Sequence, residues 1–168
     1  MQLYIVRHAW AFERDLARFP DDRLRPLEPK GIKRFRRVLR RLVQRDVCPT
    51  WIATSPLVRC RQTADLFGQQ LSNSTQIEEL DALAPGSDLD EALLWTRQKL
   101  ADTDITRAQV AWVGHSPDVE QLCARLIGDA GARIRFAKGA VASLWFADLP
   151  TIGSGRLDWL VTARMLGC

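Results

Sequence analysis

The sequence predicts an α/β fold: a three-layer α/β/α sandwich with a mainly parallel sheet, built from a single domain spanning residues 1–168. Two observations support this fold class. Short apolar runs alternate with stretches of helical periodicity, and a polar turn separates each run from the helix that follows it. A chain of 168 residues is also long enough to bury a continuous core without disulfides or a structural metal.

The first predicted element is a strand over residues 3–6. Leu3, Tyr4, Ile5 and Val6 form an uninterrupted apolar run, which is typical of a strand covered on both faces of a parallel sheet. The run ends at Arg7 and His8. The segment 9–28 has no clear period and contains two prolines, so we expect an irregular loop there that acts as a candidate lid.

The remaining elements alternate along the chain. Residues 29–45 form an amphipathic helix, because Pro29 suits the first helical position and apolar residues recur every three or four positions. Further strands are predicted at 51–54, 110–113, 140–146 and 156–161, and further helices from about 57 to 70, at 88–100 and at 118–127. Asp88-Leu89-Asp90 follows a Pro-Gly-Ser turn, so we interpret its carboxylates as a helix start and not as a phosphatase DxD motif.

The net charge of +4 is concentrated on one helix. We interpret these residues as a solvated helix face that can also attract an anionic partner. They are Lys30, Lys33, Arg34, Arg36, Arg37, Arg40, Arg41 and Arg45. Nucleic-acid binding is not expected, because the helix lacks interleaved aromatic residues beyond Phe35 and no nucleic-acid motif is present.

The positions of the cysteines argue against a metal site, a redox dithiol and a cysteine phosphatase. Cys48, Cys60, Cys123 and Cys168 form no CxxC pair and have no histidine at ligand spacing, so reduced thiols are expected, without a metal or a redox dithiol. Thr54, Leu66 and Asp129 stand six residues after Cys48, Cys60 and Cys123, where a cysteine phosphatase would require an arginine.

The start of the chain, MQLYIVRHAW, has no basic region followed by a cleavage site. No apolar run reaches the roughly 18 residues of a membrane span. We therefore expect a cytoplasmic protein that does not bind a membrane.

Candidate functional residues lie at three junctions between a strand and a helix: Arg7-His8, Ser55-Pro56 leading to Arg59, and His115-Ser116. In an open parallel sheet, ligands bind where strands end and helices begin, so these junctions are expected to converge. The only two histidines of the chain both directly follow an apolar strand. Arginine offers a planar, permanently charged fork that matches phosphate oxygens, so this set of residues favours a phosphoryl ligand.

The same residues carry a resemblance to a known family. Arg7-His8-Ala9 resembles the RHG or RHA signature of the histidine phosphatase superfamily, residues 55–63 (SPLVRCRQT) resemble its SPxxRxxQT segment, and Gly114-His115 resembles its late GH motif. Their order and spacing, from Met1 to about Ala147, are similar to those of the SixA-type phosphohistidine phosphatases. The resemblance implies a phosphoglycerate mutase-like fold without the long insertions of the mutases.

The resemblance also implies a mechanism. His8 is the nucleophile and becomes a transient phosphohistidine, while Arg7, Arg59 and a protonated His115 bind the phosphoryl oxygens. No cofactor or metal is implied, because these side chains supply the positive charge. His8 must be neutral to attack, and its ring needs a partner that fixes the tautomer, which the sequence does not identify.

The general acid is the main departure from the superfamily pattern; the other is Ala9, which replaces the usual glycine. Many members use a glutamate near the middle of the chain, where Glu78, Glu79 and Asp81 stand here without a clear match. Alignment on Arg25-Pro26-Leu27, which resembles RPL of the SixA-type branch, makes Asp22 the candidate acid.

A weak acid favours a substrate whose leaving group departs readily, so we expect phosphohistidine in a phosphotransfer protein to be the substrate and partner. Two alternatives stay open. One is a small-molecule phosphomonoesterase of the same superfamily, and the other is a phosphate-binding module without catalysis. The sequence does not indicate the oligomeric state.

Overall fold

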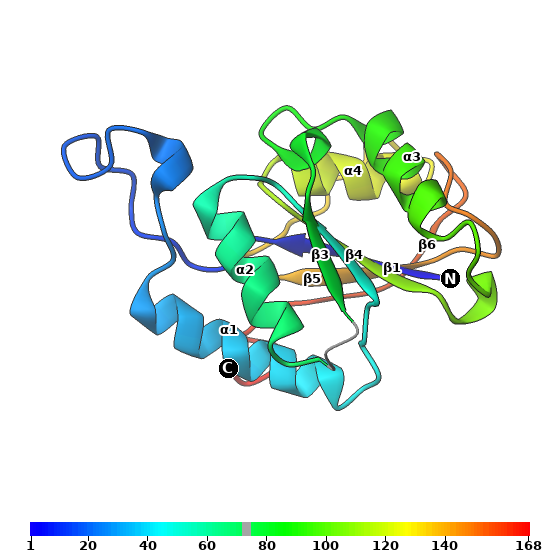
Figure 1. Cartoon of the computed structure of the whole chain (residues 1–168), viewed down its shortest axis with the longest axis horizontal. Helices are drawn as coiled ribbons and strands as arrows, with labels where there is room; N and C mark the ends of the chain where they lie inside the picture. The colour runs from blue at the N-terminus through cyan, green and yellow to red at the C-terminus, as the bar shows by residue number, and fades with distance from the viewer. Residues whose placement is uncertain (72–74) are drawn as a thin grey trace.

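A single twisted sheet lies between two layers of helices (Figure 1). The computed structural model describes residues 1–71 and 75–168, and within these ranges six strands pair in the order β3-β2-β4-β1-β5-β6. The strands are β1 (Gln2–Arg7), β2 (Trp51–Thr54), β3 (Gln76–Glu79), β4 (Gln109–Gly114), β5 (Val141–Trp145) and β6 (Arg156–Val161). The first four in this sheet order are parallel, and β5 is antiparallel to both β1 and β6. The predicted three-layer, mainly parallel sandwich is confirmed.

The helices divide the core into two halves. The helices α1 (Pro29–Val43) and α2 (Val58–Gly68) cover one face, whereas α3 (Leu89–Lys99) and α4 (Asp118–Leu126) cover the other. Phe35 and Phe67 are fully buried on the first face, and Trp112 is fully buried on the second. The indole Nε1–H of Trp112 donates to Thr96 Oγ1 at 3.0 Å, so the one polar atom of this core residue is satisfied.

The central strands β1 and β4 explain why their sequences are continuously apolar. They pair in parallel, with Ile5 opposite Trp112 and Arg7 opposite Gly114. Because helices cover both faces of the sheet, neither face of these two strands contacts solvent, and the residues between the strand ends are apolar.

The structure adds one strand to the prediction, and the ends of most predicted elements shift by one or two residues. The strand β3 was not predicted, because its sequence QIEE carries two glutamates and only an edge position lets such a strand stay partly exposed. The helix predicted to reach Arg45 ends at Val43, and Asp46 then adopts a positive φ of 61°. The helix start at Asp88 is confirmed, because its carboxylate accepts hydrogen bonds from the backbone N–H of Asp90 and Glu91.

The loop between β1 and α1 leaves the body of the molecule and returns to it (Figure 1). Its base is closed by a bridge between Ala11 and Leu27, and the backbone N–H of Leu27 also donates to Gln62 Oε1 at 2.7 Å. A short 3₁₀ helix, Asp22–Leu24, forms its returning arm. The expected irregular segment is thus present, and it is fastened at its base to α2.

Within the described ranges, no helix combines the length and apolar character that crossing a membrane requires.

The first turn of α1 packs directly on the loop. A Cβ atom added to Gly31 would lie 2.4 Å from the carbonyl oxygen of Trp10 and 2.7 Å from its Cβ, distances at which something must shift. We therefore expect Gly31→Ala to lower the free energy of unfolding by about 1–3 kcal/mol, as overpacking does in other cores. Urea unfolding measures this change. The neighbouring exposed position gives the control: Lys30→Ala is expected to be close to neutral, and equal stability of the two variants would contradict the close packing.

Candidate active site

The pairing of β1 with β4 brings the two histidines together. Arg7 is opposite Gly114 in the parallel register, so the next residues, His8 and His115, leave the sheet side by side with ring centroids 5.4 Å apart. The backbone N–H of His8 donates to the Gly114 carbonyl at 3.0 Å. At the end of β2, the Ser55 N–H donates to the Val113 carbonyl, so the third junction joins the same place. The expected convergence of the three junctions is confirmed.

The ring of His8 is held in one tautomer. Its Nδ1 lies 2.7 Å from the carbonyl oxygen of Ala9. A carbonyl oxygen only accepts, so Nδ1 carries the proton and the lone pair resides on Nε2. Burial lowers the pKa of His8 to about 4, and the nearby guanidiniums of Arg59 and Arg7 oppose a further positive charge. At neutral pH the ring is therefore uncharged, with a free lone pair on Nε2.

Arg59 is the hub of the site. It stands in the first turn of α2, and its guanidinium donates through Nη1 to the Asp22 carbonyl at 2.9 Å. The same nitrogen lies 3.2 Å from the Asp22 carboxylate, and Nη2 lies 3.3 Å from Nδ1 of His115. Only 6% of the Arg59 side chain is exposed, so these interactions are poorly screened by solvent. Arg59 thus joins the loop, α2 and the end of β4.

His115 is neutral here, contrary to the expectation of a protonated ring. Burial is the largest cause that lowers its pKa, to about 3, and the charge of Arg59 acts in the same direction. Because Arg59 can only donate to Nδ1, the proton of the ring resides on Nε2, which donates to Ser55 Oγ at 2.8 Å. The buried thiol of Cys60 also lies 3.4 Å from this Nε2, and burial raises the pKa of the thiol to about 12.

Arg7 is held from the opposite side of the site. Its Nη1 donates to the carbonyl oxygen of Phe136 at 2.7 Å. The carboxylate of Glu120 on α4 accepts from the Phe136 N–H and from Ser116 Oγ, and so fixes the segment that receives Arg7. Within the described part of the chain, only three buried side-chain N or O atoms lack a partner, and two are the Nε–H groups of Arg7 and Arg59. The site therefore has more N–H donors than acceptors, which suits an anionic ligand.

Asp22 is placed at the site, but as a carboxylate. Hydrogen bonding to Arg25 is the largest cause that lowers its pKa, and the charge of Arg59 adds to this effect. A carboxyl group with a lowered pKa is ionised at neutral pH and is not ready to donate a proton. The geometry confirms the position of the predicted acid, whereas the charge state argues against an acid role in the unliganded site.

Two of the alternative acids, Glu78 and Glu79, are engaged by other side chains. Glu78 accepts from Trp95 Nε1 at 2.9 Å and pairs with Lys99 at 2.6 Å. Glu79 lies 3.5 Å from Arg61. Asp81 opens a 3₁₀ helix after β3. These contacts give Glu78 and Glu79 structural partners outside the histidine pair.

Sequence reasoning assigned no role to several residues that build the site. Thr63 Oγ1 accepts from the Ala9 N–H at 3.0 Å and donates to the Arg59 carbonyl, so it links the start of the loop after β1 to α2. Gln62 holds the base of the loop at Leu27, and Glu120 holds the segment that accepts the Arg7 side chain. The first two belong to the SPLVRCRQT segment, which was the available signal. Glu120 stands outside every motif.

No group of three or more His, Cys, Asp or Glu side chains is arranged to hold a metal ion in residues 1–71 and 75–168.

Comparison with known proteins identifies what the site resembles. Residues 3–87 match the family model described as histidine phosphatase superfamily (branch 1). An uncharacterized protein from Picosynechococcus sp. is 34% identical over 146 residues, which cover 86% of this chain and 84% of the relative.

Solved structures give a similar picture. The protein histidine phosphatase SixA, complexed with tungstate, superposes with a TM-score of 0.82 at 26% identity and covers 99% of both chains. A mycobacterial glucosyl-3-phosphoglycerate phosphatase in complex with inorganic phosphate superposes with a TM-score of 0.71 at 15% identity, over 97% of this chain and 98% of the other. The second likeness is one of fold alone.

The burial of two neutral histidines makes stability depend on pH. In the unfolded chain each ring has a pKa near 6.5, whereas the folded values are about 4 and about 3. Between these values the unfolded state binds more protons, so stability is full above pH 6.5 and falls as the pH drops. We expect a loss of roughly 2 kcal/mol per histidine between pH 7 and pH 5. Urea unfolding at the two pH values measures it. His115→Gln should remove about half of the loss, and an unchanged pH dependence in this variant would contradict the assignment.

Proposed function

Because the chain belongs to the histidine phosphatase superfamily, branch 1, and is a phosphatase, we propose that it works without a metal, through a phosphohistidine intermediate on His8. We propose further that its substrate is phosphohistidine in a signalling phosphotransfer protein of the cytoplasm. The observation that carries the proposal is the state of His8, a buried neutral imidazole with its proton on Nδ1 and a free lone pair on Nε2.

The first step is an in-line displacement. The Nε2 lone pair of His8 forms a bond to phosphorus as the bond from phosphorus to the leaving group breaks. Arg7 and Arg59 bind the phosphoryl oxygens and stabilise the charge that grows on them in the transition state. Their unpaired Nε–H groups supply the excess of donors for this task. A bound phosphoryl group would also favour the protonated form of His115, because an adjacent negative charge raises the pKa of an imidazole.

The second step is hydrolysis of the phosphorylated His8. A water oxygen attacks phosphorus, the Nε2–P bond breaks, and inorganic phosphate leaves. An ionised Asp22, held beside Arg59, is suited to accept the proton of this water. We therefore propose Asp22 as a base in the second step, in place of the acid role that the sequence suggested.

The substrate class follows from the leaving group. A protonated imidazole leaves phosphorus readily, whereas an alkoxide needs a proton from the enzyme. Asp22, the candidate acid beside Arg59, is ionised and has no proton to donate to a leaving group. The site therefore favours phosphohistidine over phosphate esters. The likeness to SixA, over nearly the whole of both chains, supports the same substrate class.

The test of the function is a turnover assay in the presence of EDTA, with a histidine phosphotransfer domain carrying phosphohistidine and with p-nitrophenyl phosphate. We expect rapid loss of phosphohistidine, slow hydrolysis of the ester, and a loss of at least about a thousandfold in both for His8→Ala. Comparable ester hydrolysis would favour the small-molecule phosphomonoesterase. Absence of His8-dependent turnover on either substrate would leave only a phosphate-binding module.

Asp22→Asn tests the role of the carboxylate. If Asp22 accepts the proton of the attacking water, the variant should slow the second step by about a hundredfold and accumulate acid-labile phosphate on His8. Phosphate-affinity electrophoresis or intact-protein mass spectrometry would detect this species. Asp21→Asn is the matched control, because Asp21 is exposed and caps the same 3₁₀ helix. A slow first step with no phosphorylated enzyme would instead support the acid role.

A further inference from the structure

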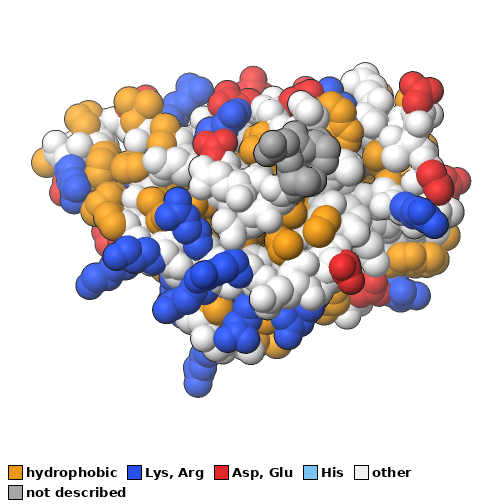
Figure 2. All heavy atoms as spheres, turned by 60° about the horizontal axis from the view of Figure 1, so that its bottom comes forward, with side chains coloured by type: hydrophobic (Ala, Val, Ile, Leu, Met, Phe, Trp, Pro, Cys, Tyr) orange, Lys and Arg blue, Asp and Glu red, His pale blue; other side chains and the backbone are white. Residues whose placement is uncertain are grey.

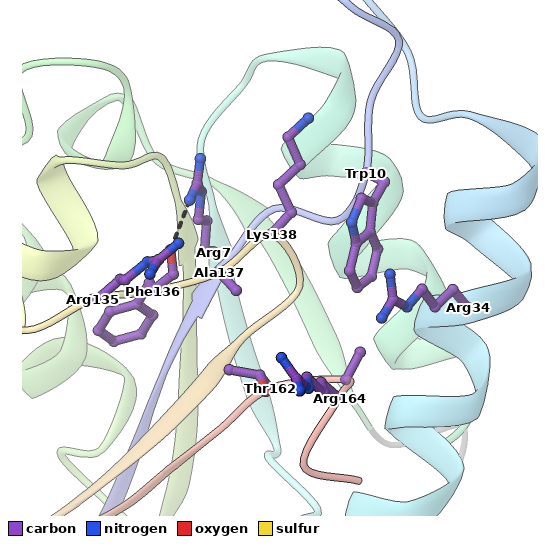
Figure 3. Close-up of a pocket in the computed structure, with 10 residues that line it drawn as sticks. Arg7, Trp10, Arg34, Arg135, Phe136, Ala137, Lys138, Thr162 and Arg164 are labelled. Atoms are coloured by element: carbon purple, nitrogen blue, oxygen red, sulfur yellow. Dashed lines mark hydrogen bonds between the residues drawn. The ribbon is translucent and has the colours of Figure 1, made fainter. Parts of the chain in front are cut away.

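A basic hollow opens beside the candidate active site (Figure 3). This cavity, of about 530 Å³, shares Arg7 with the candidate active site. Its other cations come from three further segments of the chain: Arg34 lies on α1, Arg135 and Lys138 lie before β5, and Arg164 lies after β6. Five positive charges therefore surround one open hollow, which we call the basic cavity.

The basic cavity is fixed relative to the nucleophile. The segment 135–140 contributes residues 135–138 to its wall and accepts the Arg7 side chain at the Phe136 carbonyl. The same segment is hydrogen-bonded to the backbone of β1: Gly139 N–H donates to the His8 carbonyl at 3.0 Å, and Arg7 N–H donates to the Ala140 carbonyl at 3.1 Å. A molecule that occupies the cavity thus lies next to a phosphoryl group held at Arg7.

The opposite wall is also preorganised. The guanidinium of Arg34 lies 4.4 Å from the centre of the Trp10 ring, in a cation–π contact, and donates to the Cys168 carbonyl. Gly139, at φ 67°, leaves room for the Trp10 ring, because an added Cβ would lie 2.8 Å from it. Figure 3 shows Trp10 and Arg34 stacked beside the hollow. Trp10 therefore lines this cavity.

The charge of the basic cavity is poorly compensated. Lys138 has a weak partner in Glu13, at 3.5 Å, and Glu13 is almost fully exposed. Arg135 and Arg164 form no ion pair with a carboxylate side chain in residues 1–71 and 75–168, and Arg34 is held by the Cys168 oxygen. Like charges on fixed walls repel one another, so an anionic occupant stabilises this arrangement.

The basic surface continues along α1. A neighbouring hollow is lined by Arg37, Arg40 and Arg41 together with Cys168, the residue that Arg34 contacts. Figure 2 shows Lys and Arg side chains gathered on the face that contains α1. The positive surface therefore extends from Arg7 well beyond the space that a single small anion would fill.

We propose that the basic cavity and the adjoining face of α1 bind an acidic surface of the phosphorylated protein substrate, and thereby select which phosphoprotein is dephosphorylated. The inference rests on the proposed function. The proposed ligand is a protein, because the cations are spread over four segments of the chain and an open surface, a larger area than a small anion would cover. Complementary charge of this kind acts mainly on encounter and affinity, and the chemical step at His8 is left unchanged.

The test uses the double variant Arg135→Gln/Arg164→Gln, which removes two exposed charges of the cavity that the mechanism does not use. The probe is an acidic histidine phosphotransfer domain that carries phosphohistidine. We expect kcat/KM to fall about tenfold through KM, with kcat unchanged, and the salt dependence of kcat/KM to weaken. Hydrolysis of p-nitrophenyl phosphate should stay within about twofold of the wild type. The matched control, Arg97→Gln/Arg107→Gln, removes the same charge from α3 and the turn before β4.

The outcomes separate the two proposals. If the wild type turns over the phosphoprotein and the cavity variant does so equally well, or if the control variant loses as much, the docking role is wrong and the proposed function stands. An equal loss on p-nitrophenyl phosphate would also overturn the docking role, because the cavity would then support the catalytic residues themselves. If the wild type does not turn over phosphohistidine, the proposed function fails and the inference fails with it.

Discussion

The parallel pairing of β1 with β4 is the constraint on which the rest of the structure depends. This pairing sets Arg7 opposite Gly114 and therefore places His8 and His115 beside each other where the strands end. A shift of the register by one residue would place the ends of the two strands out of line and separate the rings. The apolar runs that precede the two histidines keep both strands in the interior of the sheet, where the residues between the strand ends are buried.

The burial that fixes the histidines also determines their charge. A ring that loses its water and faces two guanidiniums is more stable without a proton, so both histidines are held neutral. For His8 the neutral ring keeps a lone pair on Nε2, which a protonated ring would lack. Protonation of either ring therefore destabilises the folded state. The large apolar core on each side of the sheet stabilises the fold against this effect.

Arg59 distributes its hydrogen bonds so that three elements are held at once. It contacts Asp22 in the loop and His115 after β4, while its own backbone carbonyl receives Thr63 Oγ1 on the next turn of α2. The motif that contains Arg59 is therefore a structural unit as well as a chemical one. The surrounding surface is basic far beyond this unit.

Much of this protein was determined by contiguous stretches of its sequence. Apolar runs and helical periodicity record local burial, so the strand-helix alternation and the fold class were predictable, and the residues of the three strand ends were predictable from their position and chemistry. Only the tertiary structure decided the rest. The edge strand β3 depends on its place in the sheet, and the charge states of His115 and Asp22 depend on Arg59, Arg25 and the depth of burial. Glu120 and the basic cavity are assembled from segments far apart in the chain, and such long-range assembly leaves no pattern in a local stretch of residues.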